Sequence, residues 1–374
     1  MANSLYVHIP FCKRKCIYCN FYSCIYKEGD ASDYVDAILL QLGRLAEPFR
    51  TVYVGGGTPT ALSLPLLKKL MQGLSHLSKD SAEFTFEANP ESLDREKLKI
   101  LLGHGVNRLS IGMQSLKDEK LKALGRIHDA RKAVEAVVSA SKSGFDNISI
   151  DLIFGLWGER PDQWKRELEE AVRLPVKHIS CYELTYEKGT PLFGMLENKA
   201  ITPPEDDAVA GMYEIAIEEL ALRGFKQYEV SNFAKPGFES RHNTNYWENS
   251  PYLGLGAAAF SYDGATRSKN ISDACEYARL VLTGKNITDF SEKLPPERRA
   301  KETAAVKIRT RDGIDFSWFK DKTGYDLENL AKKAIPKLID EGFIKYKRDK
   351  DTITGICLKR KGFLFCDTVS SSLL

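Results

Sequence analysis

The sequence contains no apolar run long enough to cross a bilayer, for which a helix needs about 20 consecutive apolar residues. It also lacks the apolar segment of a secretory signal, because Pro10, Cys12 and Lys13 fall where that segment would continue. The net charge is only +3 over 374 residues, too small by itself to indicate a nucleic-acid partner. We therefore expect a cytoplasmic protein whose eight cysteines are ligands or buried thiols rather than disulfides.

The first 225 residues alternate six times between a short β-like run and an amphipathic helical run. Such an alternation predicts a parallel sheet with outer helices. A closed eight-unit barrel would need two more units, so we expect an open, incomplete barrel. The predicted strands are residues 4–10, 51–54, 83–89, 108–115, 147–156 and 178–186.

The remaining sequence divides into two further predicted regions. Residues 226–296 are rich in aromatics and glycine and do not continue the alternation, so we expect sheet extension and loops there. Residues 297–374 predict a helix, a second helix with an apolar stripe from Leu327 to Ile339, a hairpin and a final helix, as in a small winged-helix-type module. Its hairpin is basic, but the helix before it is mixed in charge. We therefore expect a solvated face and no nucleic-acid partner.

Three cysteines lie close together after the first predicted strand. Cys12, Cys16 and Cys19 form a C-x3-C-x2-C triplet. Three thiolates can bind three irons of a four-iron cluster and leave the fourth iron open to another ligand. The alternative is zinc, which in structural sites takes four protein ligands. The next candidates for such a site, Cys24 and His8, are awkwardly placed.

Further candidate residues follow the next four strands, where parallel sheets bind their ligands. The turn GGGTPT, residues 55–60, lets the backbone come close to a ligand, although an ordinary strand-to-helix turn would look the same. Glu87 ends a strand and could bind a ribose hydroxyl or cap a helix. Gln114, Arg126 and Asp151 lie at or after strand ends, and each alone would be read as a surface or capping residue.

A second group of polar and aromatic residues lies in the segment 228–247. It contains Arg241, His242, Asn243, Tyr246 and Trp247. Histidine is a common haem ligand, and aromatic side chains pack against flat macrocycles. The alternative is a structural loop in which His242 and Asn243 satisfy backbone groups.

Together, these blocks resemble one branch of the radical S-adenosylmethionine (SAM) superfamily, which contains the oxygen-independent coproporphyrinogen III oxidases and the HemW-type haem chaperones. The resemblance covers nearly the whole chain, through YVHIPFC, GGGTPT, RLSIGMQS, DLIFGL and RHNTNYW in that order. It implies an α/β fold: a partial (β/α)6 radical SAM barrel with a small C-terminal helical, winged-helix-like domain. The corresponding regions would be 1–225, 226–296 and 297–374.

The resemblance also implies a role for each candidate residue. Cys12, Cys16 and Cys19 would bind a [4Fe-4S] cluster, whose open iron is chelated by SAM in this superfamily. The positions that would line this SAM are Tyr6, Gly56, Gly57, Thr58 and Glu87. Those that match a second SAM site of the oxidases are Gln114, Arg126 and Asp151.

Two features favour the haem chaperones over the oxidases. Phe21 stands where the oxidases carry a fourth cysteine, and the HNxxYW motif of the chaperones is present as His242 to Trp247. We therefore expect a protein that binds haem, with His242 as candidate ligand, and that passes it to membrane respiratory enzymes. No residue is assigned a catalytic role, and porphyrinogen decarboxylation is the alternative function.

Several secondary expectations accompany this interpretation. The cytoplasmic protein would associate peripherally with the membrane while it delivers haem. A homodimer is also compatible with the resemblance. Two positions depart from the family pattern: Trp157 replaces a usual proline, and Phe260 replaces a common histidine. Both departures lie in loops that we expect to face a ligand.

Overall fold

Six strands expected from the sequence form the parallel centre of one large sheet. The structure is a computed structural model that describes residues 2–45 and 48–374. The predicted α/β fold with an open parallel sheet is confirmed. The strands lie side by side in chain order: β1 (Ser4–Ile9), β4 (Phe49–Gly56), β5 (Ser78–Ala88), β6 (Arg108–Gln114), β7 (Asn147–Phe154) and β8 (His178–Glu183).

The following segment extends this sheet at both of its edges. β11 (Tyr252–Leu255) adds a further parallel strand beside β1. Beyond it lie the antiparallel strands β12 (Phe260–Tyr262), β13 (Thr266–Asn270) and β14 (Thr288–Lys293). The other edge carries β10 (Asn232–Ala234) and β9 (Lys226–Gln227), also antiparallel. The two edges do not pair with each other, so the barrel stays open.

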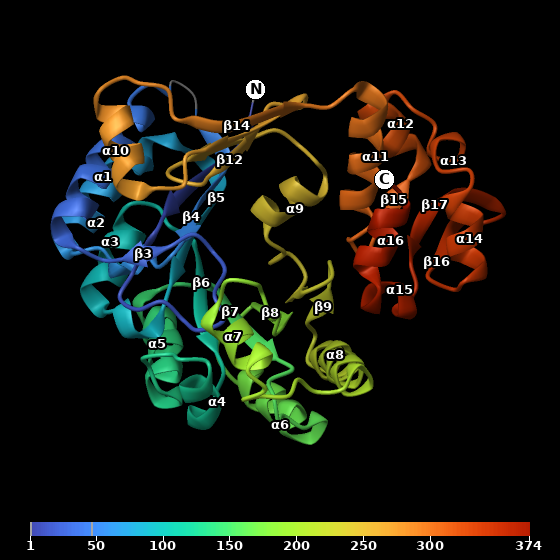
Figure 1. Cartoon of the computed structure of the whole chain (residues 1–374), viewed down its shortest axis with the longest axis horizontal. Coiled ribbons are helices and arrows are strands. Elements are labelled where there is room, and N and C mark those ends of the chain that lie inside the picture. Colours follow the sequence, from blue (N-terminus) through green and yellow to red (C-terminus); the bar gives the residue numbers. More distant parts are fainter. Residues whose placement is uncertain (1, 46–47) are drawn as a thin grey trace.

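One part of this segment is a helix rather than the loop we expected. Residues Arg241–Trp247 form α9, which packs against β4 and α11 (Pro296–Lys307). Figure 1 shows α9 between the sheet and the C-terminal helices. The outer helices lie on the other side of the sheet: α1 (Glu28–Leu42), α2 (Leu64–Leu74), α3 (Arg95–Gly103), α5 (Ala130–Ser143), α6 (Pro161–Ala171) and α8 (Asp206–Leu222).

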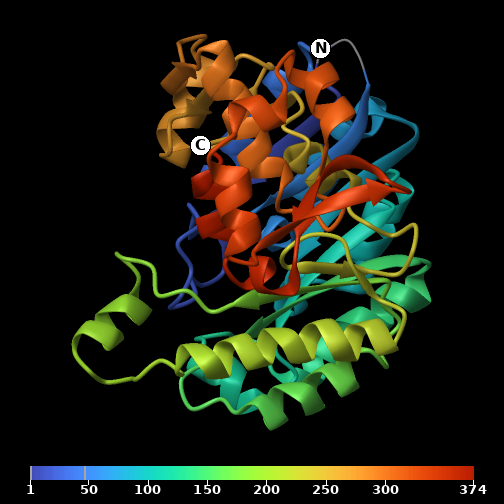
Figure 2. The ribbon, with the colours of Figure 1, turned by 90° about the vertical axis from the view of Figure 1, so that its right-hand side faces the viewer.

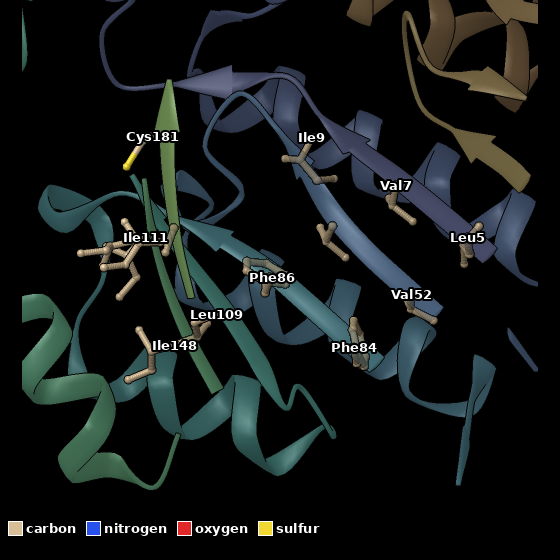
Figure 3. Close-up of a cluster of buried hydrophobic side chains, with 14 of the residues drawn as sticks. Leu5, Val7, Ile9, Val52, Phe84, Phe86, Leu109, Ile111, Ile148 and Cys181 are labelled. Carbon is tan, nitrogen blue, oxygen red and sulfur yellow. The ribbon is translucent and has the colours of Figure 1, made fainter. Parts of the chain in front are cut away.

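Alternation along the strands separates an apolar face from a polar one. In β1, Leu5, Val7 and Ile9 are fully buried in the main core, whereas Tyr6 and His8 face the opposite side. The strand register continues the apolar face across the sheet, because Leu5 pairs with Val52 and Val52 with Phe84. Figure 3 shows these residues along neighbouring strands. The concave side is therefore left to polar and aromatic side chains.

Besides α9, three described α-helices that precede α11 fall outside the six βα units. They are α4 (Asp118–Ala123), α7 (Pro191–Glu197) and α10 (Ala274–Leu282), and the last packs on α1. The segment with α7 projects from the body of the sheet, in light green in Figure 2. It is nevertheless anchored, since Leu192 N–H donates to the carbonyl of Ile17 at 2.9 Å.

The C-terminal region is built around a three-stranded sheet and short helices. β15 (Ile314–Asp315) pairs with β17 (Thr352–Leu358), which forms the predicted hairpin with β16 (Ile344–Asp349). The prediction of a single helix with an apolar stripe from Leu327 to Ile339 is wrong. It is divided into α13 (Leu327–Leu330) and α14 (Ala334–Asp340), because Pro336 lacks an N–H and fits only a first helical turn. The other helices are α12 (Phe316–Thr323), α15 (Arg360–Leu364) and α16 (Cys366–Ser372).

Within residues 2–45 and 48–374, no helix is both long enough and apolar enough to span a membrane.

Candidate cluster and ligand cavity

The cysteine triplet lies in a loop that is closed at its base by two short strands. β2 (Phe11–Cys12) pairs in parallel with β3 (Cys24–Ile25). The Cys24 N–H donates to the carbonyl of Pro10 at 2.8 Å, and the Tyr26 N–H donates to that of Cys12 at 2.9 Å. These bonds fix both ends of the loop, so the three cysteines project from a constrained segment beyond the carboxyl end of β1.

The glycine turn after β4 packs directly against this loop. Gly57 N–H donates to the carbonyl of Ile9 at 2.9 Å, and Thr58 N–H to that of Phe11 at 2.8 Å. A Cβ on Gly57 would lie 2.7 Å from the Pro10 backbone, and one on Gly56, where φ is +114°, would lie 2.5 Å from the His8 ring. The turn therefore requires glycine at both positions for close packing.

The cysteine loop, the glycine turn and the strand ends surround a cavity of ≈ 520 Å³. Ten of the residues singled out from the sequence line it together: Cys12, Cys16, Cys19, Gly56, Gly57, Thr58, Glu87, Gln114, Arg126 and Asp151. Tyr6 and His242 are not among its lining residues. The other lining residues include Asn89, Ser110 and Tyr182, which the sequence analysis did not single out.

Asn89 connects two of the cysteines through a chain of hydrogen bonds. Its Nδ2 donates to Thr58 Oγ1 at 2.8 Å, and that hydroxyl lies 3.5 Å from Cys12 Sγ. Its Oδ1 accepts from Arg126 Nη2 at 2.8 Å, while Arg126 Nη1 lies 3.4 Å from Cys16 Sγ. The only signal for Asn89 in the sequence was its place two residues after Glu87, at the end of a strand.

The three cysteines of the triplet share one cavity. Within the described residues, no three His, Cys, Asp or Glu side chains gather tightly enough to hold one metal ion. Cys12, Cys16 and Cys19 instead line a shared cavity, each partly exposed to it. Burial raises the pKa of the Cys12 and Cys19 thiols, so a positively charged centre is needed to favour their thiolates. Three thiols around such a space fit a four-iron cluster.

Two of the carboxyl groups that line the cavity come from strands β5 and β7. Glu87 accepts from the Tyr53 hydroxyl at 2.6 Å and from Gly56 N–H at 3.0 Å, and burial raises its pKa to about 7. Asp151 accepts from the Ser110 hydroxyl at 3.4 Å, and burial likewise raises its pKa. Near neutral pH, Glu87 can therefore either donate a hydrogen bond to a ligand hydroxyl or accept one from it.

Tyr6 and His242 lie deeper on the concave side of the sheet. The Tyr6 hydroxyl is 2.9 Å from His8 Nδ1. His242 is 1% exposed, and both of its ring nitrogens have partners: Nδ1 is 2.8 Å from Thr51 Oγ1, and Nε2 is 2.9 Å from the Tyr246 hydroxyl. Burial lowers the pKa of His242 to about 3, so the ring is neutral. To bind an iron, His242 must first give up one of these partners.

The two departures from the family pattern also lie outside the cavity lining. Trp157 packs with Ile17 and Leu192 in a small apolar cluster behind the cysteine loop. Phe260 lies on β12, 40% exposed, with Lys269 Nζ 5.9 Å from the centre of its ring. Trp157 thus packs against the same apolar cluster as Ile17 of the cysteine loop, whereas Phe260 belongs to the extended edge of the sheet.

Comparison with known proteins places this site in a family. The Radical SAM superfamily model matches residues 6–179, and the HemN C-terminal domain model matches residues 294–365. A heme chaperone HemW of Bacillus subtilis is 35% identical over 349 residues, covering 91% of this chain and 92% of the relative. The chain belongs to the HemW family of radical SAM proteins. A second HemW, from Lactococcus lactis, is 33% identical and covers 100% of this chain and 97% of its own length.

The fold is also that of a solved oxidase structure. The solved coproporphyrinogen III oxidase HemN of Escherichia coli superposes with a TM-score of 0.84, covering 99% of this chain and 89% of the oxidase. Its sequence is only 21% identical, so the likeness concerns the fold alone. Membership of the radical SAM superfamily implies a [4Fe-4S] cluster and SAM as cofactors.

The bonds made by Asn89 lead to a testable prediction. In Asn89→Ala, both Thr58 and Arg126 lose the side chain that orients them toward a cysteine. Residues behind metal ligands typically change metal affinity by about ten- to a hundredfold. We expect iron release from the reconstituted protein to a chelator to become about tenfold faster. Asn89→Asp keeps the acceptor for Arg126 and should fall in between, and equal release rates for all three proteins would contradict the prediction.

Proposed function

We propose that this protein is a haem chaperone that binds haem and passes it to haem-requiring proteins while holding a [4Fe-4S] cluster and SAM. The observation that carries the proposal is the end-to-end similarity to heme chaperones in a chain whose three cysteines line one cavity. Acceptors that fit this function are respiratory enzymes of the membrane, which the protein would approach as a peripheral partner. A homodimer is compatible with this function.

We propose the following cofactor positions within the cavity. Cys12, Cys16 and Cys19 would bind the cluster, whose open iron takes the amino and carboxylate groups of SAM. Gly56, Gly57 and Thr58 would lie along this SAM, with Glu87 at its ribose. Tyr6 would act indirectly, because its hydroxyl bonds to His8 and His8 packs against Gly56. The residues suited to a second SAM are Gln114, Arg126 and Asp151.

We propose His242 as an axial haem ligand in a conformation where Nε2 has exchanged the Tyr246 hydroxyl for iron. His242→Ala should then alter the visible spectrum of bound ferric haem and speed its dissociation about tenfold. Tyr246→Phe removes the hydroxyl that bonds to His242 Nε2. It should therefore slow the dissociation of haem roughly threefold, which corresponds to the free energy of one hydrogen bond. The same dissociation rates and spectra in the two variants and the parent would contradict this role.

The second candidate function is a radical SAM enzyme that acts on a porphyrinogen. It is favoured by the shared cavity, because the residues that the resemblance assigns to two SAM molecules, Glu87, Gln114, Arg126 and Asp151 among them, all line it. One experiment separates the two functions: anaerobic reconstitution with iron and sulfide, followed by haem titration and a 5′-deoxyadenosine assay on the same sample. The chaperone predicts saturable haem binding without carbon dioxide from coproporphyrinogen. Carbon dioxide release with strongly stimulated SAM cleavage would establish the enzyme instead.

A further inference from the structure

At the mouth of the cysteine cavity, one aromatic side chain is largely exposed. Phe21 is 68% exposed although it lines the cavity, two residues after Cys19. Most of the phenyl ring is therefore in water, and a ligand that covered it would gain its apolar area. Tyr182, from the end of β8, lines the same cavity and is 42% exposed. The cavity thus offers aromatic surface from two separate elements.

Two cations accompany Phe21 at the mouth. Arg14 and Lys15 are exposed, lie on the same loop and line the same cavity. In the described part of the chain, neither side chain forms an ion pair or a hydrogen bond with another residue. The acidic residues of the cavity, Glu87, Asp151 and Glu183, instead come from strands β5, β7 and β8. The cysteine loop therefore offers an aromatic face with positive charge beside it, a pattern that suits a flat ligand with acidic groups.

We propose that the mouth of this cavity is the site where haem is first captured. Phe21 stacks on the macrocycle, and Arg14 and Lys15 pair with its two propionates. The inference rests on the proposed function and names the first contact of the haem. It requires no axial ligand, so it is compatible with the buried position of His242, which would bind iron only after α9 has rearranged. It also places the captured haem at the cavity that the three cysteines line.

The test is a titration of the reconstituted full-length protein with haem and with metal-free protoporphyrin. Phe21→Ala should weaken both ligands about tenfold, because stacking does not depend on the iron. Phe21→Trp should restore the affinity of the parent. The matched control is Phe290→Ala, which removes a phenylalanine that is 44% exposed on β14, outside the cavity lining, and it should leave both affinities unchanged.

The charges are tested with the double variant Arg14→Ala, Lys15→Ala. It should bind protoporphyrin about tenfold more weakly at low salt, with a smaller difference at high salt. The dimethyl ester of protoporphyrin has no carboxylates, so the parent and the double variant should bind it equally. Iron content is measured in each sample, so that a loss of the cluster is not mistaken for a loss of the site.

The failures of the two proposals are distinguishable. If the parent binds haem but Phe21→Ala binds it equally well, the capture site is wrong and the chaperone function stands. The same conclusion follows if Phe290→Ala weakens binding as much as Phe21→Ala. If the reconstituted parent binds neither haem nor protoporphyrin, the chaperone function itself falls.

Discussion

Cys16→Ser is expected to hold no [4Fe-4S] cluster after anaerobic reconstitution with iron and sulfide. Cys16 lines the cavity together with the other two cysteines, and Arg126 Nη1 lies 3.4 Å from its sulfur. With serine there, only two soft ligands remain, and a hydroxyl binds iron poorly at neutral pH. Iron and labile sulfide should fall from about four of each per chain to near zero, together with the visible absorbance of the cluster.

The matched control is Cys275→Ser, which removes an exposed thiol on α10 outside the cavity lining. It should keep the full iron and sulfide content of the parent. A cluster that survives in Cys16→Ser, or one that is lost equally in Cys275→Ser, would contradict the assignment of the triplet.

Glu83→Ala is expected to lower the free energy of unfolding by about 3 kcal/mol, because it leaves several buried hydrogen-bond donors unpaired. Glu83 is 6% exposed, and its carboxylate holds the start of α9. It accepts from the N–H groups of Arg241 at 2.8 Å and His242 at 2.9 Å, and from the Ser240 hydroxyl at 3.3 Å. Its removal leaves these donors without an acceptor near the start of the helix.

Chemical denaturation of the unliganded protein measures this effect. Glu239→Ala is the control, since the Glu239 carboxylate accepts from the exposed N–H of Gly237 at 2.9 Å and should contribute at most about 0.5 kcal/mol. Equal stability of Glu83→Ala and the parent would show that α9 is held in place by its other contacts.

The parallel sheet could be predicted from the sequence because each strand and helix there carries its own periodicity. In β1, for example, apolar residues alternate with Tyr6 and His8, and α5 is closed by Gly144 in the left-handed conformation. Helix α9 could not be predicted in this way. It has only seven residues, and its N–H groups are satisfied by Glu83, which is 159 residues from His242 in the chain.

Most of the residues that the sequence predicts for the candidate site line the cavity. The spacing of the cysteines, the glycine turn and the strand ends brought these residues together, because parallel strands end on one edge of the sheet. Asn89 could not be predicted from the sequence, because its role depends on hydrogen bonds to Thr58 and Arg126, which lie in other parts of the chain. The motif around His242 gave no sign that both ring nitrogens would be bonded and buried.

The number of haem molecules bound per chain, measured on protein reconstituted with iron and sulfide, tests the proposed function most directly. A haem chaperone should take up one equivalent with a saturable change in the visible spectrum and should release no carbon dioxide from coproporphyrinogen. An absence of saturable haem binding, combined with carbon dioxide release in the presence of SAM, would contradict the proposed function and identify a porphyrinogen decarboxylase.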